Sequence, residues 1–304
     1  MNYAYTSARV RALENRLLGA DTVEQLISCS ELKECIRILN SCGIVGDSAE
    51  EILANAAKDK ADITNQLIDD VKDIEVIFYE KTFHNLKAAI KKLYTQSDVH
   101  SIYFSESLLD GEFIEKCIVD GRFDMLPQNM SRAAEEAYKT LLRTGDGQLS
   151  DIIIDKACLD AMLAFAKDVK HEILKKYVYE TVAVADIKTA MRLGREDRER
   201  ALSAMAECPY FRTEALLRAA EGRKSLEEFL KGSGFADIDL DNIDRWSRER
   251  ITRILKSEKY NIFTPAPAIN FILALESQLN LIRLILVCKA GGIDESFIRS
   301  KAVI

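Results

Sequence analysis

Glycine and proline are scarce in this chain, and their scarcity limits what it can fold into. Only 13 glycines and 4 prolines occur among the 304 residues, well below the usual shares of about 7% and 5%. Folds rich in strands need many tight turns, and tight turns need these two residues. The chain is therefore predicted to be all-α, with long helices joined by few connections. No segment alternates cleanly enough to predict a strand.

Capping signals indicate where two early helices begin. Asp21 with Glu24 has the spacing of a capping box, in which each residue satisfies a backbone N–H of the other. That helix is expected to run towards Asn40. Ser48 with Glu51 has the same spacing and is expected to open a second helix.

Two later helices have clear ends. Segment 172–193 carries apolar residues at helical spacing, and Gly194 is expected to end it. The longest element is expected between Thr264, as its N-cap, and Gly291-Gly292. Because that segment is apolar on nearly every side, it is predicted to be a buried helix.

The chain also repeats itself weakly. The stretches 84–91, 185–192 and 280–287 share a pattern of an apolar residue, a basic residue, two further residues and a second apolar residue. Their offsets are 101 and 95 residues, too long for the common solenoids, whose repeats run from about 20 to 50 residues. The spacing predicts three similar helical-bundle units.

The boundaries of these units follow from the repeat positions. We place the first unit at 1–96, the second at 97–197 and the third at 198–304. The three repeat helices, near 75–95, 172–193 and 266–289, are expected to occupy equivalent positions in their units.

Charge and hydropathy exclude several functions. Forty-nine acidic against 42 basic residues give a formal charge of −7, whereas a general nucleic-acid binder carries a basic excess. No unbroken apolar run approaches the 18 residues of a membrane span. The first residues lack the apolar core and cleavage site of a signal peptide. We therefore expect a cytoplasmic protein with no nucleic-acid partner and no direct membrane insertion.

The seven cysteines do not suggest a metal site. Their number is odd, no two are spaced as CxxC, and the three histidines are scattered. Zinc sites usually need closely spaced pairs of such ligands. We expect buried, reduced thiols and no bound metal.

One acidic motif suggests an enzyme. Asp69, Asp70 and Asp73 form a DDxxD pattern, which on one helix face holds magnesium on a diphosphate in all-α prenyl-transferring and terpene-forming enzymes. The best partner motif contains Asp241 and Asp244. The alternative interpretation is a solvated acidic helix face. Because no P-loop, GxSxG or HExxH occurs either, we expect no catalytic residue, no nucleotide site and no cofactor.

Three stretches carry a resemblance that covers the whole chain. The N-terminal residues 3–18, the stretch 177–195 and the C-terminal run 263–293 are similar, in that order, to the C subunit of the archaeal and bacterial A/V-type rotary ATPases. The eukaryotic counterpart is the V-ATPase d subunit. The three repeat helices fall where that family has three internally related units.

The chain departs from the family pattern of Asp-x-x-Asn-apolar-basic on each repeat helix. The Asp positions read Thr82, Ala183 and Gln278, and the Asn positions read Asn85, Asp186 and Leu281. The basic position is retained in all three, as Lys87, Lys188 and Arg283.

The resemblance implies a non-catalytic rotor subunit. In that family the three units form a pseudo-three-fold funnel whose broad end sits on the membrane ring of proteolipid c (or K) subunits. The funnel receives the central shaft of D and F subunits and carries torque between ATP turnover and proton or sodium transport. Such a subunit is peripheral on the cytoplasmic face of the membrane. The rivals are a free-standing helical adaptor and the magnesium-dependent enzyme.

The retained basic residues are the predicted partner-binding residues. Because buried unpaired charge is costly, Lys87, Lys188 and Arg283 should reach water or acidic partners, and the shaft could supply the acids. Alternatively each pairs within its own unit, Lys87 with Glu80 and Lys188 with Asp186.

Overall fold

The computed structural model describes residues 3–96, 102–194 and 196–301, and within these ranges the chain is helical. The described residues form no strand, only an isolated bridge between Cys208 and Phe211. The all-α prediction is therefore confirmed. The chain divides into two compact units, one containing the residues up to Ile74 and from Glu258 onward, and the other running from Glu75 to Ser257.

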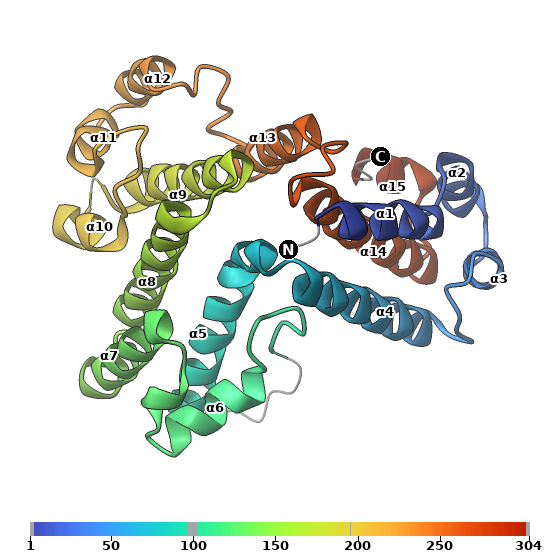
Figure 1. Cartoon of the computed structure of the whole chain (residues 1–304), viewed down its shortest axis with the longest axis horizontal. Coiled ribbons are helices and arrows are strands. Elements are labelled where there is room, and N and C mark those ends of the chain that lie inside the picture. The colour runs from blue at the N-terminus through green and yellow to red at the C-terminus, as the bar shows by residue number, and fades with distance from the viewer. Residues whose placement is uncertain (1–2, 97–101, 195, 302–304) are drawn as a thin grey trace. The chain divides into compact units, whose positions relative to one another are not determined.

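The first unit combines both ends of the chain (Figure 1). Its elements are α1 (Tyr3–Leu13), η1 (Glu14–Arg16), α2 (Ala20–Ser28), α3 (Leu32–Ser41), α4 (Ala49–Asp70), α14 (Ala266–Ala290) and α15 (Glu295–Lys301).

Helix α14 is the centre of this unit. It packs against α4, α1 and α3, and its residues Ile282, Ile285 and Leu286 join a buried apolar cluster with α2, α3 and α4. Each of these three side chains is at most 1% exposed. Burying side chains of this size stabilises a fold by about 1.5–3 kcal/mol each, so α14 holds the N-terminal helices α2, α3 and α4 in place.

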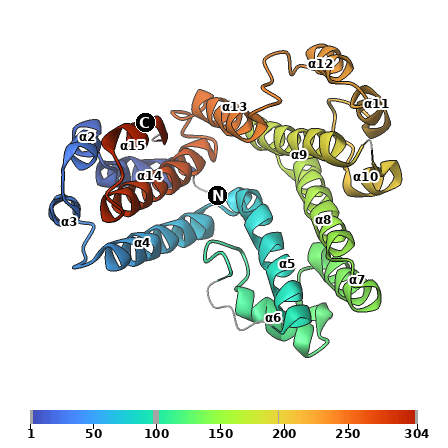
Figure 2. The same ribbon diagram turned by 180° about the vertical axis from the view of Figure 1, so that it is seen from behind.

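The second unit contains the remaining helices (Figure 2). They are α5 (Tyr79–Thr95), α6 (Gly111–Val119), η3 (Phe123–Met125), α7 (Gln128–Thr144), α8 (Gly147–Asp168), α9 (Glu172–Leu193), α10 (Arg198–Ala204), α11 (Thr213–Ala219), α12 (Arg223–Gly232) and α13 (Ile243–Ser257). A 3-10 segment, η2 (Lys72–Phe78), leads from α4 into α5.

The order of elements repeats along the chain. Three couples of successive α-helices, which are α4 and α5, then α8 and α9, then α13 and α14, each follow a group of other helices. The first long helix of each couple packs on the second long helix of the preceding couple, α8 on α5 and α13 on α9. Helix α4 packs on α14, so the same rule joins the last couple to the first.

A buried charge cluster holds the second unit together. Glu180 of α9 is 1% exposed, and its carboxylate accepts bonds from Arg250 Nε at 2.7 Å, Arg250 Nη2 at 2.9 Å and the Tyr210 hydroxyl at 2.9 Å. The Arg250 guanidinium of α13 lies over the rings of Phe235 and Trp246, 4.8 and 5.2 Å from their centroids. An arginine can form this bidentate contact with a carboxylate and stack on aromatic rings, whereas a lysine cannot.

The helix ends agree with the sequence in part. Ser48 caps α4 by accepting the Glu51 N–H, and α9 ends at Leu193 before Gly194, as predicted. The prediction for Asp21 is wrong, because α2 begins at Ala20 after Gly19 and ends at Ser28.

The long apolar helix also differs from its prediction in detail. Helix α14 begins after Pro265, and the Thr264 hydroxyl bonds the carbonyl of Asn261 instead of capping it. It is not buried on every side, since Val287 is 58% exposed. By length and composition alone, it is the one helix in the described ranges that could cross a membrane, a test that core helices also pass.

The Glu180–Arg250 pair gives a direct stability prediction. Replacing Arg250 by Leu should lower the free energy of unfolding of the second unit by about 3–5 kcal/mol, because it leaves a buried carboxylate without its cation. Trp246, the single tryptophan, reports this unfolding by its fluorescence in denaturant. The control is Arg253→Leu, since Arg253 is 70% exposed and lies 3.7 Å from Asp237, and it should cost at most about 1 kcal/mol. Equal losses in the two variants would contradict the assignment.

Candidate functional site

The second helix of each couple, α5, α9 and α14, carries a polar side chain that binds the backbone of a connecting segment. On α5 this residue is Asn85, which is fully buried. Its Oδ1 accepts the Phe104 N–H at 2.7 Å, and its Nδ2 donates to the Phe104 carbonyl and to Ser107 Oγ, both at 2.9 Å. One turn earlier, Thr82 Oγ1 accepts the Leu108 N–H at 3.0 Å. The segment before α6 is thus fixed on α5.

Helices α9 and α14 repeat this contact with other residue types. Asp186 of α9 is also fully buried, and its Oδ1 accepts the Ala206 N–H at 2.9 Å, in the segment after α10. Gln278 of α14 accepts the Leu18 N–H at 2.7 Å, in the segment before α2. We call Asn85, Asp186 and Gln278 the anchor residues. Each one ties down a segment among the next group of short helices.

Burial perturbs one anchor strongly. The interior of the second unit raises the pKa of Asp186 to about 7, and the Ala206 N–H and nearby Lys156 only partly oppose this effect. Its second oxygen, Oδ2, is buried and has no hydrogen-bond partner among the described residues. A charged Asp186 carboxylate is therefore left with one oxygen that has no hydrogen bond within the described ranges, whereas the neutral Asn85 amide of α5 has partners for both its oxygen and its nitrogen.

The predicted partner-binding residues lie on the same helices. Successive residues of an α-helix are about 100° apart, so Lys87 and Lys188, two positions after Asn85 and Asp186, lie on the far side of the helix from the anchor. Lys87 Nζ is 2.6 Å from Asp155 of α8, and Lys188 pairs with Asp244 of α13. The structure thus pairs both lysines with a neighbouring helix, and not with Glu80 or Asp186.

Arg283 differs from the two lysines. It is exposed, and its Nη1 donates to Asn280 Oδ1 at 3.3 Å on the same helix. Within the described ranges no carboxylate lies in ion-pair contact with it. Of the three basic residues, Arg283 has the positively charged group that is most available to a partner.

A groove that the sequence analysis missed runs beside Lys87. Its volume is about 490 Å³, and His84, Lys87, Lys91 and Lys92 of α5 contribute to its wall. Each lysine is matched by a carboxylate, since Lys91 pairs with Asp151 at 2.6 Å and Lys92 with Glu115 at 2.8 Å. The spacing of the lysines along α5 could have indicated this groove. The carboxylates that pair with them lie on other helices and cannot be predicted from the local sequence.

The geometric premise of the enzyme hypothesis is wrong. Helix α4 ends at Asp70, so Asp69 and Asp73 do not share a helix face, and the Asp70 side chain lies outside what the structure describes. Asp73 accepts the Tyr3 hydroxyl at 2.6 Å.

The second acidic motif is engaged elsewhere. Asp241 forms two 2.7 Å bonds with Arg223, and Asp244 pairs with Lys188. In the described part of the chain, no group of three or more His, Cys, Asp or Glu side chains is placed to hold a metal ion. Six of the seven cysteines are buried as expected, whereas Cys42 is exposed.

Comparison with known proteins decides the family. The family model described as ATP synthase (C/AC39) subunit matches residues 6–301. The chain belongs to this family. A curated relative, the C subunit of the V-type sodium ATPase of Enterococcus hirae, is 20% identical over 312 residues, which cover 95% of this chain and 94% of the relative. The resemblance to the C subunit of the V/A-type ATPases is therefore confirmed over almost the full sequence.

Polar side chains of all three helices hold the connecting segments, Thr82 and Asn85 on α5, Asp186 on α9 and Gln278 on α14. The polar role is thus shared among the three helices even though the residue types differ. The retained basic positions lie off this contact and on more accessible helix faces.

Asp186 predicts a pH-dependent stability. Its pKa is about 7 in the fold and about 3.9 in an unfolded chain, so the native state binds the proton more tightly. The free energy of unfolding should fall as pH rises from about 4 to about 7, by up to about 4 kcal/mol from this group. Asp186→Asn keeps an acceptor for Ala206 and removes the charge. It should be more stable than the original chain at pH 8, and the difference should shrink towards pH 4.

Trp246 fluorescence in denaturant, recorded across that pH range, measures this difference. The control is Asp168→Asn, which removes an exposed carboxylate at the end of α8 and should leave the pH slope nearly unchanged. A difference between Asp186→Asn and the original chain that does not vary with pH would refute the assignment.

Proposed function

We propose that this chain is a non-catalytic rotor subunit of a V/A-type ATPase or ATP synthase. It couples the central shaft of D and F subunits to the membrane proteolipid ring, in proton or sodium transport linked to ATP synthesis or hydrolysis. The observation that carries the proposal is the family match over residues 6–301. The name of the Enterococcus hirae relative, which belongs to a sodium ATPase, supports ion transport as the process served.

The repeated order of helices supports a three-unit organisation. We propose units at 1–96, 97–197 and 198–304 that surround a pseudo-three-fold axis as a funnel. Helices α5 and α9 end at Thr95 and Leu193, close to the two proposed boundaries. The packing of α8 on α5, α13 on α9 and α4 on α14 follows one rule, as a closed three-fold arrangement requires. An experimental structure in which α5, α9 and α14 do not superpose would refute this part.

A rotor component of this kind needs stiffness more than chemistry. Close-packed interiors transmit strain, and every long helix here packs on a neighbour from another repeat. The proposed location is the cytoplasmic face of the membrane, peripheral to it, with α14 serving as a core helix of its unit.

We further propose that Lys87, Lys188 and Arg283 contact carboxylates of the shaft. The side chains of Lys188 and Asp244 are 42% and 76% exposed, and that of Asp155 is 51% exposed. Exposed pairs are worth about 0–1 kcal/mol, so Lys188 can exchange its partner at little cost. The Lys87 side chain is 22% exposed and pairs with an accessible carboxylate. Arg283 has no carboxylate to give up among the described residues.

The test is binding of the purified chain to a purified complex of D and F subunits at low and high salt. The triple variant Lys87→Ala, Lys188→Ala and Arg283→Ala should bind roughly tenfold to a hundredfold more weakly, since each pairing contributes up to about 1 kcal/mol. Its affinity should also depend less on salt.

A matched control removes the same charges elsewhere. Lys139, Lys175 and Arg245 each pair with a carboxylate on their own helix, and replacing all three by Ala should leave the affinity unchanged. If both triple variants bind alike, the proposed charge contacts are wrong. If the unaltered chain binds neither the shaft nor the ring, the coupling function itself is wrong.

A further inference from the structure

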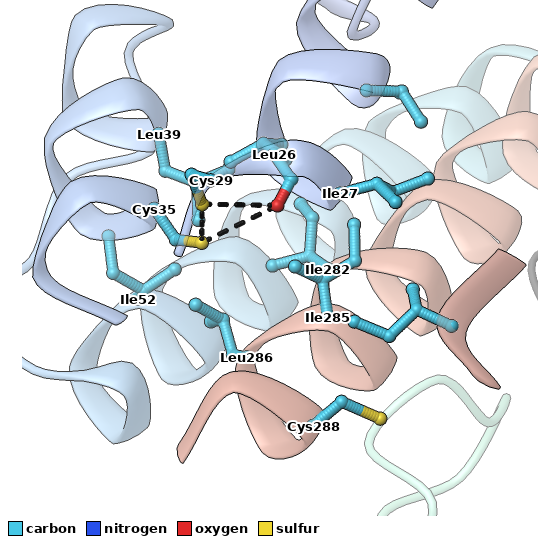
Figure 3. Close-up of a cluster of buried hydrophobic side chains, with 12 residues drawn as sticks. Leu26, Ile27, Cys29, Cys35, Leu39, Ile52, Ile282, Ile285, Leu286 and Cys288 are labelled. Atoms are coloured by element: carbon cyan, nitrogen blue, oxygen red, sulfur yellow. Dashed lines mark hydrogen bonds between the residues drawn. The ribbon is translucent and has the colours of Figure 1, made fainter. Parts of the chain in front are cut away.

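Two buried cysteines meet at the corner between α2 and α3. Cys29 directly follows α2, and Cys35 lies in the first turn of α3. Their Sγ atoms are 2.6 Å apart, and both approach the carbonyl oxygen of Leu26, at 3.2 and 3.6 Å. Figure 3 shows the two sulfur atoms next to each other with this oxygen to one side, and Cys288 lies apart from them in the same cluster.

This arrangement crowds two thiols around one acceptor. The sulfur atoms are closer than two non-bonded sulfur atoms normally come, and a disulfide bond would need only a short further approach, to about 2.05 Å. The three-residue connection 29–31 between α2 and α3 brings them together. Just before it, in the last turn of α2, the Ile27 carbonyl accepts a bond from Lys289 Nζ at 2.6 Å. The pairing is therefore set by the backbone of the corner, and not by flexible side chains alone.

The two thiols differ in access. Cys29 is 8% exposed, whereas Cys35 is fully buried. Burial, followed by the contact with Cys29, raises the pKa of the Cys35 thiol to about 12. A thiol reacts with oxidants as its thiolate and needs access to them, so Cys29 is the residue that meets an oxidant first and Cys35 the one that resolves the product.

We propose that Cys29 and Cys35 form a dithiol–disulfide site that a small peroxide oxidises. Cys29 Sγ attacks one oxygen of hydrogen peroxide, the O–O bond breaks, and water leaves with the thiol proton, giving a sulfenic acid. Cys35 Sγ then attacks Cys29 Sγ, the S–O bond breaks, and the second water leaves with the Cys35 proton. Two thiols are oxidised by two electrons, and one peroxide is reduced to two waters.

The site would respond to oxidation inside a protein that is otherwise reduced. Intracellular disulfides are usually transient and redox-sensing. The cross-link would fix the α2–α3 corner, whose residues Leu26, Ile27 and Leu39 pack in the same cluster as α14 and α4. This inference concerns the thiols alone and does not rest on the proposed coupling function.

Peptide mapping of the full chain tests the site. The protein is treated with hydrogen peroxide, catalase ends the reaction, free thiols are blocked with N-ethylmaleimide, and the unfolded chain is digested with trypsin without reductant. Lys33 lies between the two cysteines, so cleavage separates peptide 17–33 from peptide 34–37. Mass spectrometry should show these two peptides joined, about 2 Da lighter than their sum, and dithiothreitol should release them.

Exposed Cys42 reports that the oxidant has acted. Oxidation of Cys42 without any joined peptide would overturn the proposal, as would joining of Cys29 to Cys42 or Cys288 to the same extent. Two variants are matched controls. Cys42→Ser should still give the joined peptide, whereas Cys35→Ser should lack it and leave a sulfenic acid at Cys29 that dimedone traps. Absence of the dimedone adduct in folded Cys35→Ser would contradict the assigned order.

Discussion

One kind of contact recurs in the structure, in which a polar side chain of a helix accepts the backbone N–H of a connecting segment. The Ala206 N–H is buried, and those of Phe104 and Leu18 are partly buried. A buried N–H without an acceptor costs about 1–3 kcal/mol, and irregular segments cannot supply acceptors as a helix ladder does. The anchor residues Asn85, Asp186 and Gln278 supply them from three long helices. The short helices of each group are therefore positioned by the long helix that precedes them, and by α14 in the case of the first group.

The contacts of α14 bring both ends of the chain into one compact unit. Helix α14 packs against α4, and its Gln278 accepts the Leu18 N–H. Helix α5 likewise packs against α8 and accepts the Phe104 N–H, and α9 packs against α13 and accepts the Ala206 N–H.

Local signals predicted much of the fold and little of the site. The scarcity of glycine and proline predicted the all-α class, and the capping box at Ser48 and the glycine at 194 predicted helix ends that are present. The anchor contacts could not be predicted, because their partners are backbone groups about 20 residues away for Asn85 and Asp186 and 260 residues away for Gln278. The acidic motif at Asp69 misled because its spacing says nothing of where α4 ends.

The contact between α14 and α4 differs from the contacts of α5 with α8 and of α9 with α13 in a way that bears on Arg283. In the contacts of α5 with α8 and of α9 with α13, the second helix of one couple carries the base and the first helix of the next couple carries the acid, in Lys87–Asp155 and Lys188–Asp244. Between α14 and α4 the signs are reversed, since Lys60 of α4 pairs with Glu276 of α14. The Lys60 side chain is only 4% exposed, and a buried ammonium that loses its carboxylate costs far more than a surface pair. The reversed pair therefore secures the contact between the chain ends and leaves the retained basic residue Arg283 outside it, exposed on its own helix.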